Sequence, residues 1–70
     1  MVHAKRLLAE LSQAEFAVVM SMARGYFKDE EIAKKLYRSP NTIRTHVNSI
    51  FRKLNVHSRT DIISLLKKSE

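Results

Sequence analysis

The stretch that decides the fold runs from Ser39 to Asn55 and reads SPNTIRTHVNSIFRKLN. Its apolar residues recur every three or four positions, which is the spacing of one face of an α-helix. These residues are Ile43, Val47, Ile50, Phe51 and Leu54. Ser39 suits the N-cap position and Pro40 the first helical position, while Asn55 suits the left-handed residue that ends a helix. The stretch therefore predicts a helix over residues 40–54 with an apolar inner face.

The opposite face of this predicted helix is polar and carries no acid. Its members are Asn41, Arg44, Thr45, Asn48, Ser49 and Arg52. Solvated helix surfaces usually mix acids with bases, whereas a helix that lies in the major groove of DNA is flanked by phosphates. Arg pairs with guanine, Asn pairs with adenine, and Thr offers a methyl group to thymine. We interpret this face as a DNA-reading surface, with an ordinary solvated surface as the alternative.

Two helices are predicted before this stretch and one after it. Ser12 and Glu15 have the spacing of a capping box, and Gly25 suits the end of the helix that follows. Acids at residues 29–31 suit the positive end of a second helix. Ser58 and Asp61 form a weaker box before the last helix. The sequence thus predicts an all-α, four-helix domain with helices near 12–24, 29–37, 40–54 and 58–68 and a central helix-turn-helix.

The composition narrows the class of protein further. The chain has 70 residues, of which 44% are hydrophobic, so one small domain with a core is expected. It has no Cys, and its single Gly and single Pro are too few for a turn-rich β-domain. The net charge is +6, and residues 36–70 hold seven of the bases but only two of the acids. A polyanion is therefore the expected partner of the second half of the chain.

Other classes of function find no matching pattern. We find no Gly-rich phosphate loop, nucleophile elbow or paired carboxylates, so neither an enzyme nor catalytic residues are expected. His3, His46 and His57 lack the spacing of metal ligands, and no metal or other cofactor is expected. The longest apolar run, residues 16–20, is far shorter than the ~20 residues that span a bilayer. The start of the chain has no secretory pattern, so the expected location is the cytoplasm, without a membrane partner.

Several segments between residues 11 and 66 resemble the LuxR-type (GerE-like) DNA-binding domain of bacterial transcription regulators. These segments are Leu11-Ser12…Glu15, Ala23-Arg24-Gly25, residues 31–36 (EIAKKL), residues 42–47 (TIRTHV) and residues 50–59 (IFRKLNVHSR). The resemblance implies a domain over residues 11–68 that binds double-stranded DNA as a homodimer, at inverted repeats on the bacterial nucleoid. Residues 1–10 form an N-terminal extension with three alternatives. They continue the first helix, form a separate helical turn or fray.

The resemblance also implies roles for individual residues. It implies base contacts by Arg44, Thr45 and Asn48. It implies phosphate contacts by Ser39, Asn41, Thr42, Arg52 and Lys53. It implies a dimer interface at Ile62, Ile63, Leu66 and Lys67. The last set agrees with the sequence itself, because the apolar residues of the last predicted helix span a wider arc than one packing face needs.

One departure from the family pattern suggests a second surface. Phe16, Met20, Tyr26 and Phe27 stand where the family is usually polar, and they could form an exposed apolar patch. Its partner would be another protein or a regulatory domain of a longer chain. Alternatively, residues 1–10 cover the patch through Leu7 and Leu8. The patch supports a second reading, a protein-interaction module that modulates another regulator. A basic membrane-surface helix is disfavoured, because the core needs the apolar stripe.

Overall fold

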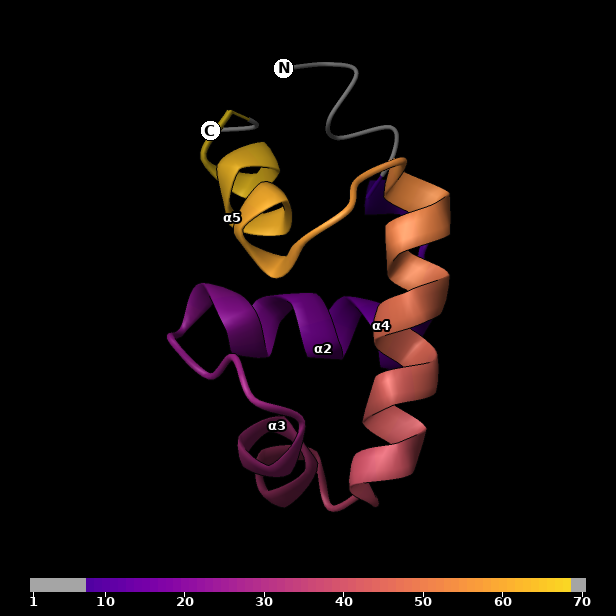
Figure 1. Ribbon diagram of the computed structural model, residues 1–70, viewed down its shortest axis with the longest axis vertical. Coiled ribbons are helices and arrows are strands. Elements are labelled where there is room, and N and C mark those ends of the chain that lie inside the picture. The colour runs from indigo at the N-terminus through magenta and orange to yellow at the C-terminus, as the bar shows by residue number, and fades with distance from the viewer. Residues whose placement is uncertain (1–7, 69–70) are drawn as a thin grey trace.

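Helices α2 (Gln13–Ala23), α3 (Asp29–Leu36), α4 (Pro40–Leu54) and α5 (Arg59–Lys68) follow one another in the computed structural model, which describes residues 8–68 (Figure 1). Leu8 and Ala9 are also helical, and a turn at Glu10 separates them from α2. The predicted all-α class is confirmed, and each predicted helix boundary lies within one residue of the observed one. Residues 1–7 lie outside the described residues, so the three alternatives for the N-terminal extension stay predictions.

The capping residues set these helix boundaries. The Ser12 hydroxyl accepts the Glu15 N–H at 3.1 Å, and the Glu15 carboxylate accepts the Ser12 N–H at 2.9 Å. The predicted capping box is therefore present at the start of α2. At the start of α4, the Ser39 hydroxyl accepts the Thr42 N–H at 3.2 Å, and Pro40 occupies the first helical position.

Left-handed residues end α3 and α4. Asn55 has a φ of 55°, which confirms the end predicted for α4. Tyr37 has a φ of 57° at the end of α3, and its side chain is 93% exposed. A bulky residue in this region is unusual, because its Cβ crowds the following carbonyl oxygen. The sequence pattern therefore gave no sign that α3 would end in this way.

The core draws side chains from all four helices. Its buried apolar members are Val18, Val19, Met22, Ile32, Ala33, Ile43, Val47, Ile50, Leu54 and Ile62. In Figure 1, α2 runs crosswise to the long α4, with α3 below it and α5 above it. The predicted inner face of α4 is confirmed, with Phe51 half-buried at its margin. Burying each large apolar side chain contributes about 1.5–3 kcal/mol, so this shared core fixes α4 relative to α3.

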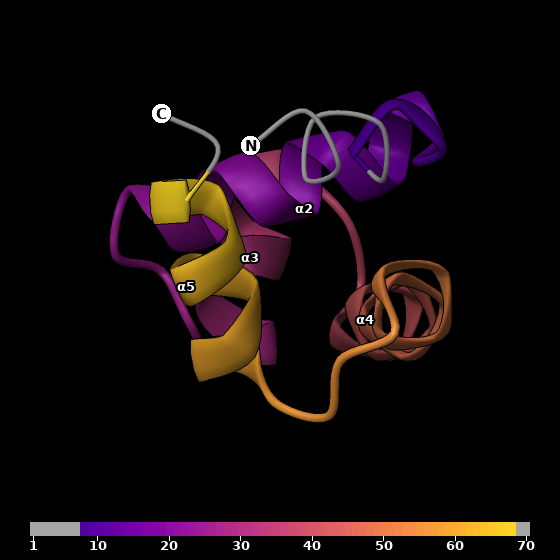
Figure 2. The same cartoon turned by 90° about the horizontal axis from the view of Figure 1, so that it is seen from above.

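Helix α5 lies at the margin of this core and packs chiefly against α2 (Figure 2). Ile62 is fully buried, whereas Ile63, Leu65 and Leu66 are half-buried against the core. The wide apolar arc expected from the sequence therefore divides into one fully buried position and a partly exposed flank.

The side chains assigned to the apolar patch differ in exposure. Phe16, Met20 and Phe27 are 45%, 37% and 43% exposed. Tyr26 is half-buried against the core, and the Lys35 ammonium lies 4.8 Å from its ring centroid. Tyr26 thus differs from the expectation of a freely exposed ring. Leu8 packs against the core, while Leu7 lies outside the described residues, so only part of the expected cover can be placed.

Candidate nucleic-acid interface

Helices α3 and α4 meet through the short turn at residues 37–39, and α3 packs against α4 below α2 (Figure 1). The turn is short because Tyr37 reverses the chain in the left-handed conformation and Ser39 already caps α4. This arrangement is the predicted helix-turn-helix. It leaves most of the outer face of α4 exposed.

Most of the predicted polar face of α4 is exposed. Its exposed members are Asn41, Arg44, Thr45, Asn48 and Arg52. Ser49 departs from the prediction, because it is half-buried and its hydroxyl donates to Glu15 Oε2 at 2.6 Å. It lies toward α2 because a buried carboxylate there offers a stronger hydrogen bond than water does. The three residues to which base contacts are assigned remain on the exposed face.

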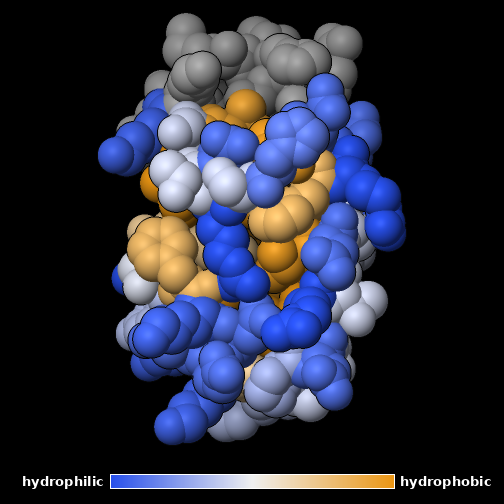
Figure 3. Space-filling model, in the orientation of Figure 1, coloured by the Kyte–Doolittle hydropathy of each residue, from blue (hydrophilic) through white to orange (hydrophobic). Residues whose placement is uncertain are grey.

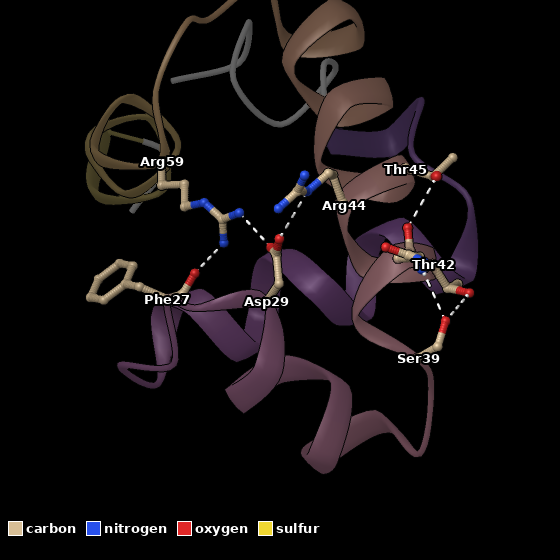
Figure 4. Close-up of polar contacts among 8 residues, drawn as sticks. Phe27, Asp29, Ser39, Thr42, Arg44, Thr45 and Arg59 are labelled. Atoms are coloured by element: carbon tan, nitrogen blue, oxygen red, sulfur yellow. Dashed lines mark hydrogen bonds and ion pairs between the residues drawn. The ribbon is translucent and has the colours of Figure 1, made fainter.

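The first turn of α4 combines a helix N-terminus with side-chain hydroxyl groups (Figure 4). The Ser39 hydroxyl caps it and lies 2.9 Å from the Thr42 hydroxyl oxygen. The Thr45 hydroxyl donates to the Asn41 carbonyl oxygen at 3.1 Å. A helix N-terminus carries a partial positive charge and N–H groups that the helix leaves unused. Because this turn contains no acid, its N–H groups and hydroxyls are suited to a phosphate.

Asp29 links α3 to both α4 and α5 (Figure 4). Its Oδ1 accepts from Arg59 Nη2 at 2.5 Å, and its Oδ2 lies 3.5 Å from Arg44 Nε. Arg59 also donates to the Phe27 carbonyl oxygen. Burial raises the pKa of Asp29, but hydrogen bonds and charge from Arg59, and then from Arg44, outweigh it and lower the pKa below 3.8. The carboxylate is therefore charged at neutral pH.

Glu15 forms a second link, between α2 and the last turns of α4. Besides the Ser12 N–H, its carboxylate accepts from the Ser49 hydroxyl at 2.6 Å and from Lys53 Nζ at 2.7 Å. Burial raises the pKa of Glu15, but these hydrogen bonds and the Lys53 charge lower it to about 2. Lys53, to which a phosphate contact is assigned, is thus also an internal ion-pair partner. Its side chain stays 38% exposed.

Neither link was predicted from the sequence. Glu15 gave one usable signal, because it shares the apolar period of α2 with Val18 and Val19, where a buried acid needs partners. Asp29 gave no such signal, because an acid in the first turn of a helix is already explained by its interaction with the helix dipole.

Of the described histidines, His46 lies on α4 and His57 lies in the segment between α4 and α5. His46 is half-buried beside a small hollow near Ala14 and Ala17. The His57 N–H donates to Asp61 Oδ2 at 3.2 Å, just before α5. His3 lies outside the described residues. Within residues 8–68, no three His or acidic side chains gather as a metal site would require.

The surface over the helix-turn-helix is hydrophilic. In Figure 3, hydrophilic residues gather on the lower part of the visible face, over α3 and the beginning of α4. Across the described ranges, none of the helices combines the length and apolar character needed to cross a bilayer. The short turn and the exposed, acid-free face of α4 together define a helix-turn-helix domain of the kind that binds nucleic acid.

Comparison with known proteins shows to which family of helix-turn-helix domains the chain belongs. The family model of bacterial regulatory proteins of the luxR family matches residues 9–66, and the chain belongs to that family. A relative from Bacillus subtilis, the uncharacterized transcriptional regulatory protein YxjL, is 38% identical over 61 residues, which are 87% of this chain and 28% of the relative. The nitrate/nitrite response regulator protein homolog of Haemophilus influenzae is 37% identical over 57 residues, 81% of this chain and 27% of the relative.

A third relative, the oxygen regulatory protein NreC of Staphylococcus carnosus, is 33% identical over 60 residues, 86% of this chain and 27% of the relative. The chain thus spans somewhat more than a quarter of the length of each of these three relatives. No solved structure matches the chain. The resemblance to LuxR-type domains is confirmed, and it places this domain among bacterial regulatory proteins.

Proposed function

We propose that this domain is the sequence-specific DNA-binding part of a bacterial transcription regulator and that α4 lies in the major groove. The observation that carries the proposal is the exposed face of α4, which is polar, free of acids and held rigidly by the core on its other side. A helix that reads base edges needs such a face, because an acid there would be repelled by the flanking phosphates. Family membership and relatives named as transcriptional regulators support the same function.

Base edges and phosphates are read by different residues in this proposal. Arg44, Thr45 and Asn48 project from the middle of the exposed face and contact bases. The phosphate contacts are assigned to Ser39, Asn41, Thr42, Arg52 and Lys53. The first three lie at the positive end of α4, and the last two lie near its other end. This division explains how one helix can be fixed on the backbone at both ends while its centre faces the bases.

The dimer is formed through α5 in this proposal. Ile62 is fully buried in the core, so a second copy of the chain would meet Ile63, Leu66 and Lys67 instead. A twofold axis places the same residues on both sides of the interface. It also places two copies of α4 in successive major grooves, about 34–36 Å apart, which corresponds to inverted repeats about one turn of DNA apart. Because α5 offers little area, pairing is expected mainly on DNA.

Selection from a random pool of duplex DNA at about 150 mM salt tests the function directly. We expect enrichment of an inverted repeat with half-sites about one turn apart. On that site, Arg44→Ala should raise Kd by roughly 5- to 150-fold and remove the preference at one base pair, since a bidentate Arg contact contributes about 1–3 kcal/mol. Failure to enrich any sequence with the folded protein would contradict base reading. A single enriched half-site would contradict only the dimer.

A second candidate function is a protein-interaction module that modulates another regulator. It rests on the exposure of Phe16, Met20 and Phe27, which lie outside the DNA-reading face. The two functions differ in their salt dependence. DNA binding loses affinity with salt in proportion to the number of phosphate contacts, whereas binding through an apolar patch should respond little.

A further inference from the structure

The Asp29 carboxylate lies between two arginines that differ in exposure. Arg59 belongs to α5 and is 29% exposed, while Arg44 projects from the reading face and is 74% exposed. Asp29 itself is only 12% exposed (Figure 4). An acid beside a DNA-reading helix is unexpected on electrostatic grounds alone, because it repels phosphate. We therefore ask what Asp29 contributes to DNA binding that offsets this repulsion.

Asp29 approaches Arg44 at Nε rather than at the end of the guanidinium. The guanidinium is a planar fork with one N–H at Nε and four at its two terminal nitrogens. A contact at Nε leaves both terminal nitrogens available, and these can donate together to O6 and N7 of one guanine. A carboxylate at the end of the fork would instead occupy the groups that read the base.

The carboxylate is itself held in place. Arg59 donates one N–H to Oδ1 and another to the Phe27 carbonyl oxygen, so it fastens Asp29 to the loop that precedes α3. Two arginines and one aspartate leave this cluster with a net charge of +1, so its total charge still suits DNA. A free Arg side chain samples many rotamers, and binding must remove part of that entropy. Holding Nε before DNA arrives reduces that cost.

We propose that Asp29 is a positioning residue that orients the Arg44 guanidinium for end-on contact with guanine and so sets the base preference at one position of the site. This inference rests on the proposed base contact of Arg44. Asp29 touches no base itself and acts only through Arg44.

The test is a double-mutant cycle of Asp29→Asn and Arg44→Ala. The readout is the discrimination ratio, the Kd for a duplex substituted at one base pair divided by the Kd for the selected duplex, measured at every position of the half-site. We expect Asp29→Asn to lower this ratio roughly three- to tenfold at the base pair that Arg44→Ala makes indifferent. In the Arg44→Ala background, Asp29→Asn should leave that ratio unchanged.

Glu30→Gln is the matched control. Glu30 is exposed on the same first turn of α3, so its replacement removes the same charge near the same DNA without touching Arg44. We expect it to raise affinity for all duplexes alike and to leave every ratio unchanged. Circular dichroism establishes a temperature at which each variant is folded. If Asp29→Asn does not fold, Asp29→Glu is used instead, because this variant keeps the charge but shifts the carboxylate by one methylene group. The discrimination ratio is then expected to fall at the same base pair.

Three outcomes would overturn the inference. The first is an unchanged ratio in Asp29→Asn. The second is an equal loss at every base pair, which would mean general loosening of the domain. The third is the same loss in the Arg44→Ala background, which would mean that Asp29 acts without Arg44. Failure of the proposed function looks different: either the native chain itself shows no discrimination, or Arg44→Ala changes no ratio at all.

Discussion

Two carboxylates near helix starts, Glu15 and Asp29, each tie together helices that are distant in the sequence, but they do so in opposite surroundings. Glu15 is 5% exposed and has one cationic partner, Lys53, so its cluster is neutral. Asp29 has two cationic partners, one of which is mostly exposed on the reading face. Both carboxylates have lowered pKa values, but only the Asp29 cluster retains an excess of positive charge.

This difference indicates that the Glu15 cluster stabilises the fold, whereas the Asp29 cluster contributes to DNA recognition. A buried carboxylate that loses its hydrogen-bond donors pays the full cost of desolvation, so the Glu15 cluster is expected to control stability. An exposed arginine adds little stability, because water screens its charge. The Asp29 cluster is therefore expected to act mainly on DNA recognition, and the following experiments test this contrast.

The largest effect is expected from Glu15→Ala. This change removes three hydrogen bonds to the carboxylate and leaves Lys53 without its internal partner. We expect the free energy of unfolding to fall by about 3 kcal/mol, as measured by urea denaturation. Arg44→Ala serves as the control on the other cluster and should change it by less than about 0.5 kcal/mol. Equal losses in the two variants would contradict the contrast.

Acid should weaken the Glu15 cluster in a defined pH window. Because the folded pKa is about 2 and the ordinary value is 4.5, the stabilisation is fully present above about pH 5 and is lost as the pH falls toward 2. Glu15 should contribute up to about 3 kcal/mol to this loss. Urea denaturation between pH 7 and pH 2 should show a steeper decline in the native chain than in Glu15→Gln. Parallel curves would show that Glu15 keeps an ordinary pKa.

Arg59→Ala separates the two arginines of the Asp29 cluster. Arg59 is the less exposed of the two, and it bonds both the Asp29 carboxylate and the Phe27 carbonyl oxygen. We expect the free energy of unfolding to fall by about 1–2 kcal/mol, against almost no change for Arg44→Ala. Thermal denaturation followed by circular dichroism measures both. A larger loss from Arg44→Ala than from Arg59→Ala would reverse the roles assigned here.

A smaller loss of stability than that of Arg59→Ala is expected from Lys53→Ala, which tests the two roles of this residue. Loss of the half-exposed ion pair with Glu15 should cost about 1 kcal/mol of unfolding free energy, because the Ser12 N–H and the Ser49 hydroxyl still donate to that carboxylate. Loss of a phosphate contact should lower the salt slope of DNA binding by about one. Arg52→Ala, at the neighbouring exposed position, should lower the slope equally and leave stability unchanged. A salt slope that Lys53→Ala leaves intact would make Lys53 a purely structural residue.

The helices and the core could be predicted from the sequence because their signals are local. Capping residues at Ser12, Ser39 and Asn55 and the apolar period of α4 depend only on neighbours along the chain. The ion pairs could not be predicted in the same way. Glu15 and Lys53 lie 38 positions apart, and Asp29 and Arg59 lie 30 apart, so their pairing depends on how the helices pack.

Part of the reading face was predicted for the same local reason. Helical periodicity places Arg44, Thr45 and Asn48 opposite the core, and they are exposed. Ser49 lies on the border between the two faces. Its hydroxyl points toward the Glu15 carboxylate, which is distant in the sequence. Tyr37 was missed because a bulky residue rarely adopts the left-handed conformation, so its identity gives no sign of the turn.

The peripheral packing of α5 affects where the domain opens locally. Helix α5 contributes one fully buried residue, Ile62, to the core and packs its half-buried residues at the margin, whereas α2, α3 and α4 supply the other buried apolar residues. The amide hydrogens of α5 are therefore expected to exchange with deuterated water through local opening, at a lower free energy than those of α4. Contact with a second copy through Ile63 and Leu66 would slow that exchange, so the same amides would report on assembly.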